Sequence, residues 1–385
     1  MRNTHLYPVD MVRVLTFACV IAVHTISTVN SVQSVYWGGA TILLHFTREA
    51  FFVLTAFVLT NRYRHNPPRV PSFLRRRFLL VGVPYLVWSL IYCGIALAAG
   101  PLPFGPATTM VLRNLATGTS WFHLYFLLVS LQFYLVFPLF RRLLRATSGH
   151  HGALVVLSGA AQLLLDLWLH DPAPTGFKAA VLPYAGSFVL SYQFFLVVGG
   201  VAAVHHVELA RWSREHRRLL LGALVGTAVL AEGRYLWQVT HGSDAVFATD
   251  VFQTVVLPWS VAVVASFYLA GMAWADRRDG ELGSRLLERA SDRSFGVFLV
   301  HPVILWALTA AGPHSPASHL PAPLSSFAIY PVAVLGSLAF VELVRRTPLS
   351  LMLTGKQRVR PDTTAAVPAA GSRQPSRPMA DRTTS

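Results

Sequence analysis

Residues 9–29 read VDMVRVLTFACVIAVHTISTV and form the first long apolar stretch of the chain. A helix of about 21 residues spans a hydrocarbon core roughly 30 Å thick. Besides Asp10 at its start, the basic side chains Arg13 and His24 interrupt the stretch. At about 100° per residue, their offset of eleven residues brings both side chains to one face, about 16 Å apart along the axis. The stretch therefore predicts a membrane helix with a polar stripe.

This stripe has two interpretations. A charge deep in a membrane helix costs at least about 2.5 kcal/mol and usually faces a protein interior or a wet cavity. In the structural interpretation, Arg13 extends its stem to the near interface and His24 hydrogen-bonds to another helix. In the functional interpretation, which we favour, both residues line the wall of an active-site tunnel.

The composition is that of a polytopic membrane protein. Of the 385 residues, 54% are hydrophobic and 13% are charged, with a mean hydropathy of +0.49. An ordinary soluble domain has about a quarter of its residues charged. Long apolar runs recur as far as residue 344, and no small-residue cleavage site follows the first one. We therefore expect a retained first span and several more.

Charge and cysteine content narrow the possible partners. The net charge of +15 could suggest nucleic acid, but in a membrane protein the distribution of basic residues matters more than their sum. Cys19 and Cys93 both lie in apolar segments, so neither a disulfide framework nor a zinc site is indicated. We expect no nucleic-acid partner and no metal.

Ten membrane spans can be drawn, and the basic residues orient them. The spans are residues 9–29, 41–60, 79–98, 122–140, 153–169, 184–204, 219–237, 251–274, 295–311 and 327–344. The connections after the even-numbered spans up to the eighth contain eighteen arginines, whereas those on the other side contain only Arg113 and Lys178. By the positive-inside rule, we predict an all-α protein of about ten transmembrane helices with both termini cytoplasmic.

The composition changes near the end of the chain. Residues 347–385 are rich in Pro, Ala, Ser, Thr and Arg and poor in apolar residues. We therefore predict one membrane domain over residues 1–346 and a disordered cytoplasmic tail over 347–385. No internal repeat and no additional soluble domain is evident.

Several polar side chains inside other spans need partners. Arg48 and Glu49 lie in the second span, where they either neutralise each other within the fold or belong to a site. His123 lies near the outer end of the fourth span, and His301 lies in the ninth, directly before a proline. A histidine beside proline is more often structural, so His301 is a weaker candidate for a direct role.

The residues leave the class of function open between enzyme and transporter. A buried, oriented imidazole suits general-base catalysis near neutral pH. Arginines suit phosphate recognition, although many of them here only set topology. The sequence contains no G-x-S-x-G or S-x-x-K nucleophile motif, no H-E-x-x-H metal motif and no Walker motif. A purely structural or sensory protein would leave the buried Arg13 and His24 without an evident reason.

Five segments, in order, resemble the integral-membrane acyltransferase-3 family, whose bacterial members acylate sugars and other hydroxylated acceptors. The segments are Asp10, Arg13 and His24 in the first span; TREAFFVLTAFVLTNRY over 47–63; SFLRRRFLLVGVPYLVWSLIY over 72–92; HLYFLLVSLQFYLVFP over 123–138; and SFGVFLVHP over 294–302. The resemblance covers residues 7 to 344, and the ten-span topology agrees with it.

The chain departs from the family pattern in places. Thr55 and Ala56 stand where Ser-Gly is usual, which keeps a hydroxyl but loses the close packing of a glycine. Arg75, Arg76 and Arg77 are contiguous, so it is open which of them correspond to the family's paired arginines. The additional extracytoplasmic hydrolase-like domain of some members is not found.

The resemblance implies roles for individual residues. His24 would be the general base on the acceptor hydroxyl or on a group that relays the acyl unit. Arg13 would orient the acyl-CoA or polarise its thioester carbonyl, and residues 75–77 would hold the phosphates of CoA. The further candidates are Glu49 and His301 for catalysis, and Arg48, His123 and Tyr85, of the Pro-Tyr pair in the third segment, for substrate binding.

The resemblance also implies an activity. We expect a membrane-bound O-acyltransferase in the bacterial cytoplasmic membrane, without a permanently bound cofactor. It would move an acetyl group from cytoplasmic acetyl-CoA to a hydroxyl of a carbohydrate or other surface or secondary-metabolite acceptor. The alternative is a transporter or flippase for a glycan or small metabolite, although the half-related repeats and broken helices typical of transporters are not apparent in the sequence.

Overall fold

The computed structural model describes residues 7–31, 33–277, 281–310 and 320–359, and these residues form helices and no strand. The helices up to the middle of the chain are α1 (Tyr7–Val29), α2 (Val35–Leu44), α3 (Phe46–Arg62), α4 (Val70–Arg77), the π-helical turn η1 (Phe78–Gly82), α5 (Val83–Ala99), α6 (Phe104–Thr117), α7 (Tyr125–Ala146) and α8 (His151–Leu169). The remaining ones are α9 (Gly176–Val181), the 3-10 turns η2 (Leu182–Ser187) and η3 (Val189–Tyr192), α10 (Gln193–Val204), α11 (His206–Glu215), α12 (Arg217–Thr240), α13 (Ala245–Ala248), α14 (Val256–Arg277), α15 (Glu281–Thr309), α16 (Leu324–Val344) and α17 (Ser350–Thr354).

This is the predicted all-α polytopic membrane fold. Eight helical segments of the described chain are long and apolar enough to cross a bilayer. A ninth is added if the pair over 176–204, bent by 61° between η2 and η3, is one span. The predicted span over 295–311 falls in the second half of α15, whose first half is rich in charge, and the last residue of that span lies outside the described part. Which side faces the cytoplasm stays a prediction from the arginine distribution.

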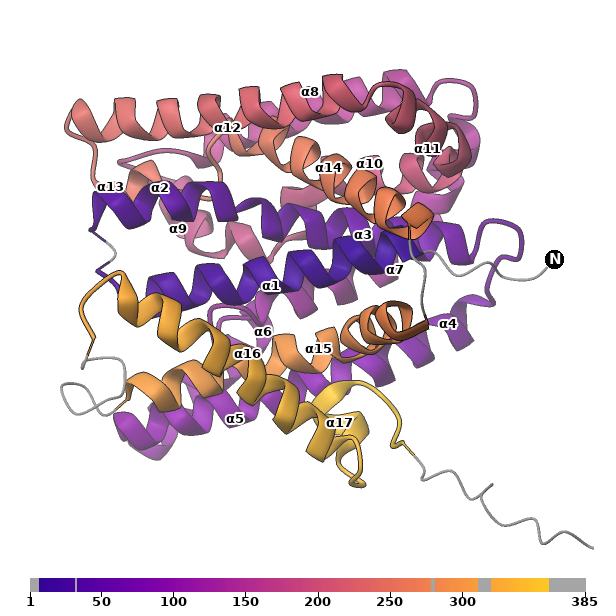
Figure 1. Cartoon of the computed structure of the whole chain (residues 1–385). Coiled ribbons are helices and arrows are strands. Elements are labelled where there is room, and N and C mark those ends of the chain that lie inside the picture. The colour runs from indigo at the N-terminus through magenta and orange to yellow at the C-terminus, as the bar shows by residue number, and fades with distance from the viewer. Residues whose placement is uncertain (1–6, 32, 278–280, 311–319, 360–385) are drawn as a thin grey trace, which may run out of the picture.

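Helix α1 lies at the centre of the bundle. It packs against α2, α3, α14, α15 and α16, so that helices from both ends of the chain surround it (Figure 1). Tyr330 of α16 donates a hydrogen bond to the carbonyl of Ala18, 3.2 Å away, and Asn30 donates one to the hydroxyl of Ser326 at 2.7 Å. Both contacts hold α16 along α1. The stretch that carries the polar stripe is therefore an interior helix.

The membrane core is aromatic and closely packed where α3 meets α10. Phe52 of α3 is fully buried and contacts the ring of Tyr192, with centroids 4.1 Å apart. A Cβ atom at Gly199 of α10 would overlap the carbonyl group of Val53, so only glycine allows the two backbones to lie this close. A glycine on α10 thus provides the close packing at this level of α3. Helix α3 itself carries Thr55 and Ala56 in place of the usual Ser-Gly.

The folded structure continues past residue 346, where the sequence-based prediction places the end of the membrane domain. Helix α17 packs against α5 and α15, and the indole N–H of Trp88 donates a hydrogen bond of 3.0 Å to the Leu353 carbonyl. This segment folds because its backbone groups find partners in the bundle, which composition alone does not reveal. Residues 360–385 of the predicted tail lie outside the described residues.

Candidate active site

Arg13 is held between the first and the fifteenth helix. Its Nη1 atom donates hydrogen bonds to the Ser291 hydroxyl at 2.8 Å and to the Asp10 carboxylate at 3.3 Å. The Ser291 hydroxyl in turn donates to the same Asp10 oxygen at 2.5 Å. The guanidinium is therefore fixed by an ion pair within α1 and by a side chain of α15, which gives the arginine a set orientation and not merely a path to the interface.

A cavity of about 830 Å³ lies on the side of the bundle where α1 begins. Its size is within the range of roughly 300–1,000 Å³ that is usual for ligand sites. Its lining includes the basic residues Arg13, Arg75, Arg76, Arg77 and Lys356. Asp292 is the acidic residue in this lining, so the cavity walls carry an excess of positive charge.

The three contiguous arginines of α4 differ in how they are held. The guanidinium of Arg77 lies over the rings of Phe73 and Tyr134, at 5.7 and 5.5 Å from their centroids. Its Nε atom is buried and makes no hydrogen bond within the described part of the chain. Arg75 and Arg76 are exposed where they border the cavity. Arg77 is thus a cation packed on two aromatic rings with an unused Nε donor, whereas the side chains of Arg75 and Arg76 are exposed at the cavity.

The polar stripe of α1 meets a second histidine deeper in the bundle. His24 Nδ1 lies 2.7 Å from His301 Nε2, and the two rings stack with an interplanar angle of 6°. The other nitrogen of His301, Nδ1, lies 2.8 Å from the Phe298 carbonyl oxygen. The structure therefore brings together two predicted site residues that the sequence separates by 277 positions.

These contacts fix the tautomers of the neutral pair. Because a carbonyl only accepts, His301 Nδ1 carries the hydrogen, and its Nε2 atom is the acceptor. His24 must then donate from Nδ1, which leaves the lone pair of His24 on Nε2. This is the arrangement that a general base needs, with one nitrogen oriented by a partner and the other free to take a proton.

His123 completes a cluster of three imidazoles. It is fully buried, and its ring centroid lies 5.6 Å from that of His301 and 5.3 Å from that of Tyr92. Neither of its ring nitrogens makes a hydrogen bond within the part of the chain that the structure describes. A buried polar group usually has a partner, so His123 stands out as a group suited to a bound substrate.

An aromatic layer separates the cavity from the histidines. Phe17 and Phe51 line the inner part of the cavity. Phe298 packs against both, with centroids 5.7 Å from Phe17 and 6.2 Å from Phe51. The same ring lies 5.1 Å from the His123 ring. A ligand reaching from the cavity to His24 must therefore pass these phenylalanines.

Arg48 and Glu49 lie apart from this path. They form a buried ion pair in which Arg48 Nε donates to Glu49 Oε1 at 2.7 Å, and Arg48 also donates to the Val251 carbonyl at 2.9 Å. The guanidinium lies over the rings of Tyr192 and Phe252. Neither residue borders the cavity. This geometry favours the structural alternative, in which the pair ties α3 to the segment before α14.

Tyr85 also lies apart from the basic cavity. Its hydroxyl donates a hydrogen bond of 2.6 Å to the Leu115 carbonyl of α6, and the residue is not part of the cavity lining. The contact connects α5 to α6, which points to a structural role for this tyrosine.

A smaller pocket, of about 390 Å³, lies towards the other end of α1. Its walls include Trp37, Asp250 and His45, together with the hydroxyl side chains Ser27, Ser31, Thr41 and Thr249. His45 stands at the break between α2 and α3. A pocket lined by an aromatic ring, a carboxylate and several hydroxyls suits a ligand with both apolar and hydroxylated faces.

Sequence reasoning missed several residues of these sites. Ser291 and Asp292 lie just before the fifth family-like segment, but no local pattern marks Ser291 as a partner of α1 or Asp292 as part of the cavity. Lys356 lies in the segment predicted to be disordered. Asp250 lies in the short connection before α14, and Trp37 lies near the start of α2, where a tryptophan is as typical of a membrane interface as of a binding site. Among the described residues, no group of three or more His, Cys, Asp or Glu side chains is placed to hold a metal ion.

The fold and these sites define a polytopic helical membrane protein with a basic cavity on one side and a histidine cluster in its interior. The chain belongs to the acyltransferase-3 family: the family model described as "Acyltransferase domain" matches residues 6–342. It is similar to the "Putative membrane-bound acyltransferase YfiQ" of Bacillus subtilis (strain 168), with 22% identity over 332 residues that cover 83% of this chain and 86% of that protein. No solved structure matches.

The family assignment decides between the two classes that the sequence left open. The chain is a membrane-bound acyltransferase, and the transporter alternative loses its basis. The donor, the acceptor and the roles of individual residues do not follow from the assignment.

Proposed function

We propose that this acyltransferase moves an acetyl group from acetyl-CoA to a hydroxyl of a carbohydrate or similar acceptor, in the bacterial cytoplasmic membrane. The observation that carries the proposal is the oriented His24–His301 pair, whose free Nε2 lone pair is that of a general base. The family assignment supplies the acyltransferase activity. The acetyl group, the carbohydrate-like acceptor and the bacterial cytoplasmic membrane are the proposed parts.

The basic cavity supports CoA as the carrier of the acyl group. Its walls hold Arg13, the arginines of α4 and Lys356, which together suit a ligand with several phosphates. The expected cytoplasmic location of this side agrees with a cytoplasmic donor. Arg13 and His24 are about 16 Å apart along α1, a separation that an extended pantetheine arm bridges. Arg13 therefore orients the donor and does not touch the reacting carbonyl.

The reaction follows from this placement. The acceptor oxygen attacks the thioester carbonyl carbon while His24 Nε2 takes the hydroxyl proton. His301 keeps the His24 ring in place and shares the positive charge that develops on it. An N–H of His123 stabilises the negative charge on the carbonyl oxygen. The carbon–sulfur bond then breaks, the proton passes to the CoA thiolate, and the acetyl ester and CoA leave.

The smaller pocket supports a carbohydrate acceptor that arrives from the side opposite the donor. A sugar has an apolar face that can lie on the ring of Trp37 and hydroxyls that can bond to Asp250 and the neighbouring hydroxyl side chains. The pocket borders α1 at Ile26 and Ser27, just past His24. A hydroxyl of the bound acceptor can therefore approach the histidine from this side.

The test uses purified protein in lipid nanodiscs, radiolabelled acetyl-CoA and a panel of free and lipid-linked sugars, with label transfer to the acceptor as the readout. We expect wild type to transfer label and His24→Ala to lose at least about a hundredfold in rate, as removal of a general base typically does. His205→Ala is the matched control, because His205 Nε2 lies 2.8 Å from His151 Nδ1 in another histidine pair, away from both pockets.

Two results would count against the proposal. Equal transfer by His24→Ala and wild type would remove His24 from the chemistry. Transfer from another acyl-CoA but not from acetyl-CoA would keep His24 as the general base but show that acetyl-CoA is not the donor.

A further inference from the structure

The segment that follows α16 forms part of the wall of the basic cavity. Leu351, Gly355, Lys356 and Gln357 all line it. The family model ends at residue 342, so this wall comes from outside the matched domain. We call residues 345–359 the C-terminal strap.

Backbone and packing contacts hold the strap in place. The Val359 N–H donates a hydrogen bond of 2.9 Å to the Arg345 carbonyl and closes the strap into a loop. The Ser350 hydroxyl donates to the Lys356 carbonyl at 2.8 Å. Gly355 has a φ of +63°, and a Cβ atom there would collide with the Leu80 carbonyl and the Phe295 ring. The strap is therefore seated on η1 and α15 and positions Lys356.

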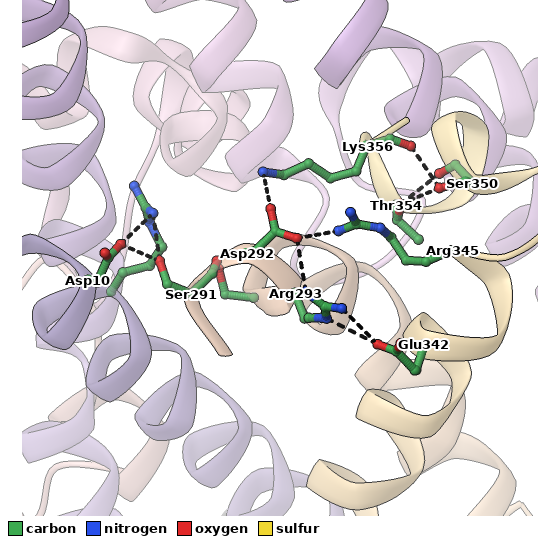
Figure 2. A network of polar contacts seen from close by, with 11 residues as sticks. Asp10, Ser291, Asp292, Arg293, Glu342, Arg345, Ser350, Thr354 and Lys356 are labelled. Atoms are coloured by element: carbon green, nitrogen blue, oxygen red, sulfur yellow. Dashed lines mark hydrogen bonds and ion pairs between the residues drawn. The ribbon is translucent and has the colours of Figure 1, made fainter. Parts of the chain in front are cut away.

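A single carboxylate ties three cations together at this place. Asp292 accepts hydrogen bonds from Lys356 Nζ at 2.8 Å, from Arg345 Nη1 at 2.5 Å and from Arg293 Nη1 at 3.2 Å (Figure 2). Arg293 also forms an ion pair with Glu342, in which Nη2 lies 3.1 Å from Oε2. Two acids, Asp292 and Glu342, thus face three bases, and Lys356 shares the Asp292 carboxylate with two arginines.

Lys356 is the member of this group suited to a ligand. Lys356 borders the cavity, whereas Arg293 and Arg345 do not. Its side chain is 44% exposed, compared with 10% for Arg345 and 19% for Arg293. An ammonium group has three donor hydrogens, so Nζ can keep its bond to Asp292 and still donate to a second anion. The arginines of α4 lie in the same cavity lining.

We infer that Lys356 is a donor-binding residue: its ammonium group, tethered by Asp292, contacts a phosphate of CoA, and the C-terminal strap is one wall of the donor site. The inference rests on the proposed function, because it takes CoA as the ligand of the cavity. It extends that function by adding a phosphate contact from a segment outside the matched family domain.

The test measures binding of free CoA to the full chain in lipid nanodiscs, by calorimetry, for wild type, Lys356→Ala, Lys356→Arg and Arg346→Ala. We expect Lys356→Ala to weaken binding roughly tenfold, since a charge-assisted hydrogen bond to a phosphate is lost. Lys356→Arg should retain most of the affinity. Arg346→Ala is the control, because Arg346 belongs to the strap but is 72% exposed and is not part of the cavity lining.

A parallel measurement with dephospho-CoA locates the contact. If Lys356→Ala weakens CoA but not dephospho-CoA, Lys356 contacts the 3′-phosphate. If it weakens both equally, the contact is with the pyrophosphate. Either result supports the inference.

Wild-type affinity for CoA in Lys356→Ala would overturn the inference and leave the proposed function intact. A wild-type protein that binds no CoA while still folded, judged by its thermal transition, would overturn both. The two failures are therefore distinguishable.

Discussion

His24 Nδ1 and His301 Nε2 lie 2.7 Å apart, and the single N–H of His301, on Nδ1, donates to the Phe298 carbonyl. The hydrogen bonds are donated in one direction, from His24 to His301 and from His301 to the α15 backbone. Two imidazoles in the interior of a membrane bundle thus have distinct roles, one as the orienting partner and the other as the group with a free lone pair.

His301 is a positioning residue, and its removal should have a different effect from the loss of His24. We expect His301→Ala to lower kcat about tenfold to a hundredfold, with little change in the KM for acetyl-CoA. Because the partner that shares the charge on His24 is gone, the pH–rate profile should also move. The profile is measured from pH 5.5 to 9. An unchanged profile with a lower rate would mean that His301 acts only through packing.

Arg13 should act on the donor and not on the chemical step. We expect Arg13→Ala to raise the KM for acetyl-CoA about tenfold or more, with a smaller change in kcat. Arg13→Lys should recover only part of the donor affinity: an ammonium can replace the single Nη1 atom that contacts both Asp10 and Ser291, but it lacks the planar fork suited to a phosphate. Initial rates over a range of donor concentrations separate the two parameters. A pure loss of kcat would instead place Arg13 at the reacting carbonyl.

Phe298 should limit the length of the acyl chain. It belongs to the aromatic layer between the cavity and the histidines, and a smaller side chain widens that passage. We expect Phe298→Leu to raise the ratio of butyryl to acetyl transfer several-fold. Leucine is used because Phe→Ala in a core typically costs about 3–5 kcal/mol of stability. An unchanged ratio of rates with the two donors would show that the passage lies elsewhere.

The smaller pocket should govern the acceptor. We expect Trp37→Ala and Asp250→Asn each to raise the acceptor KM by about fivefold to fiftyfold, through loss of a stacking surface and of a charged hydrogen-bond acceptor. The KM for acetyl-CoA should stay the same in both variants, because neither residue borders the basic cavity. A change in donor KM alone would contradict this assignment.

Asp292 should stabilise the strap over most of the pH range. Partial burial acts to raise the pKa of its carboxyl. The hydrogen bonds from Lys356 and Arg345 outweigh burial and lower this pKa below the usual value. A lowered pKa gives stabilisation that is present above the unfolded value of about 3.9 and is lost as the pH falls through the folded value. Asp292→Asn should therefore lower Tm by about 1–3 °C at both pH 6 and pH 8.

The same comparison at low pH provides the check on Asp292. The difference in Tm between wild type and Asp292→Asn should shrink below about pH 4, where the wild-type carboxyl takes up a proton. A difference that grows as the medium becomes more acidic would mean that the carboxyl is stabilising in its neutral form.

The membrane helices and the stripe of α1 could be predicted from the sequence for a physical reason. In a bilayer the backbone must satisfy its hydrogen bonds internally, and a long apolar segment does so by forming a helix. The helical period then places Arg13 and His24 on one face. The prediction was less accurate where helices break, at His45 and between η2 and η3, because only tertiary contacts stabilise a bend.

The partners of the stripe could not be predicted from local patterns. Ser291 and His301 lie in one helix almost three hundred residues after α1, and nothing near Arg13 or His24 identifies them. The strap was missed for a related reason. Its composition is polar, but Trp88 and the space around Gly355 give it a fixed seat in the bundle.

The distance in sequence between the stripe and its partners has a consequence for biosynthesis. Helix α1 is the first of the described helices to leave the ribosome, and α15 and α16 are among the last. Until α15 has been inserted, Arg13 has no Ser291 and His24 has no His301, and lipid is a poor substitute for either. The nascent first helix must therefore wait at a sheltered or hydrated site, such as the insertion machinery, while most of the protein is still being translated.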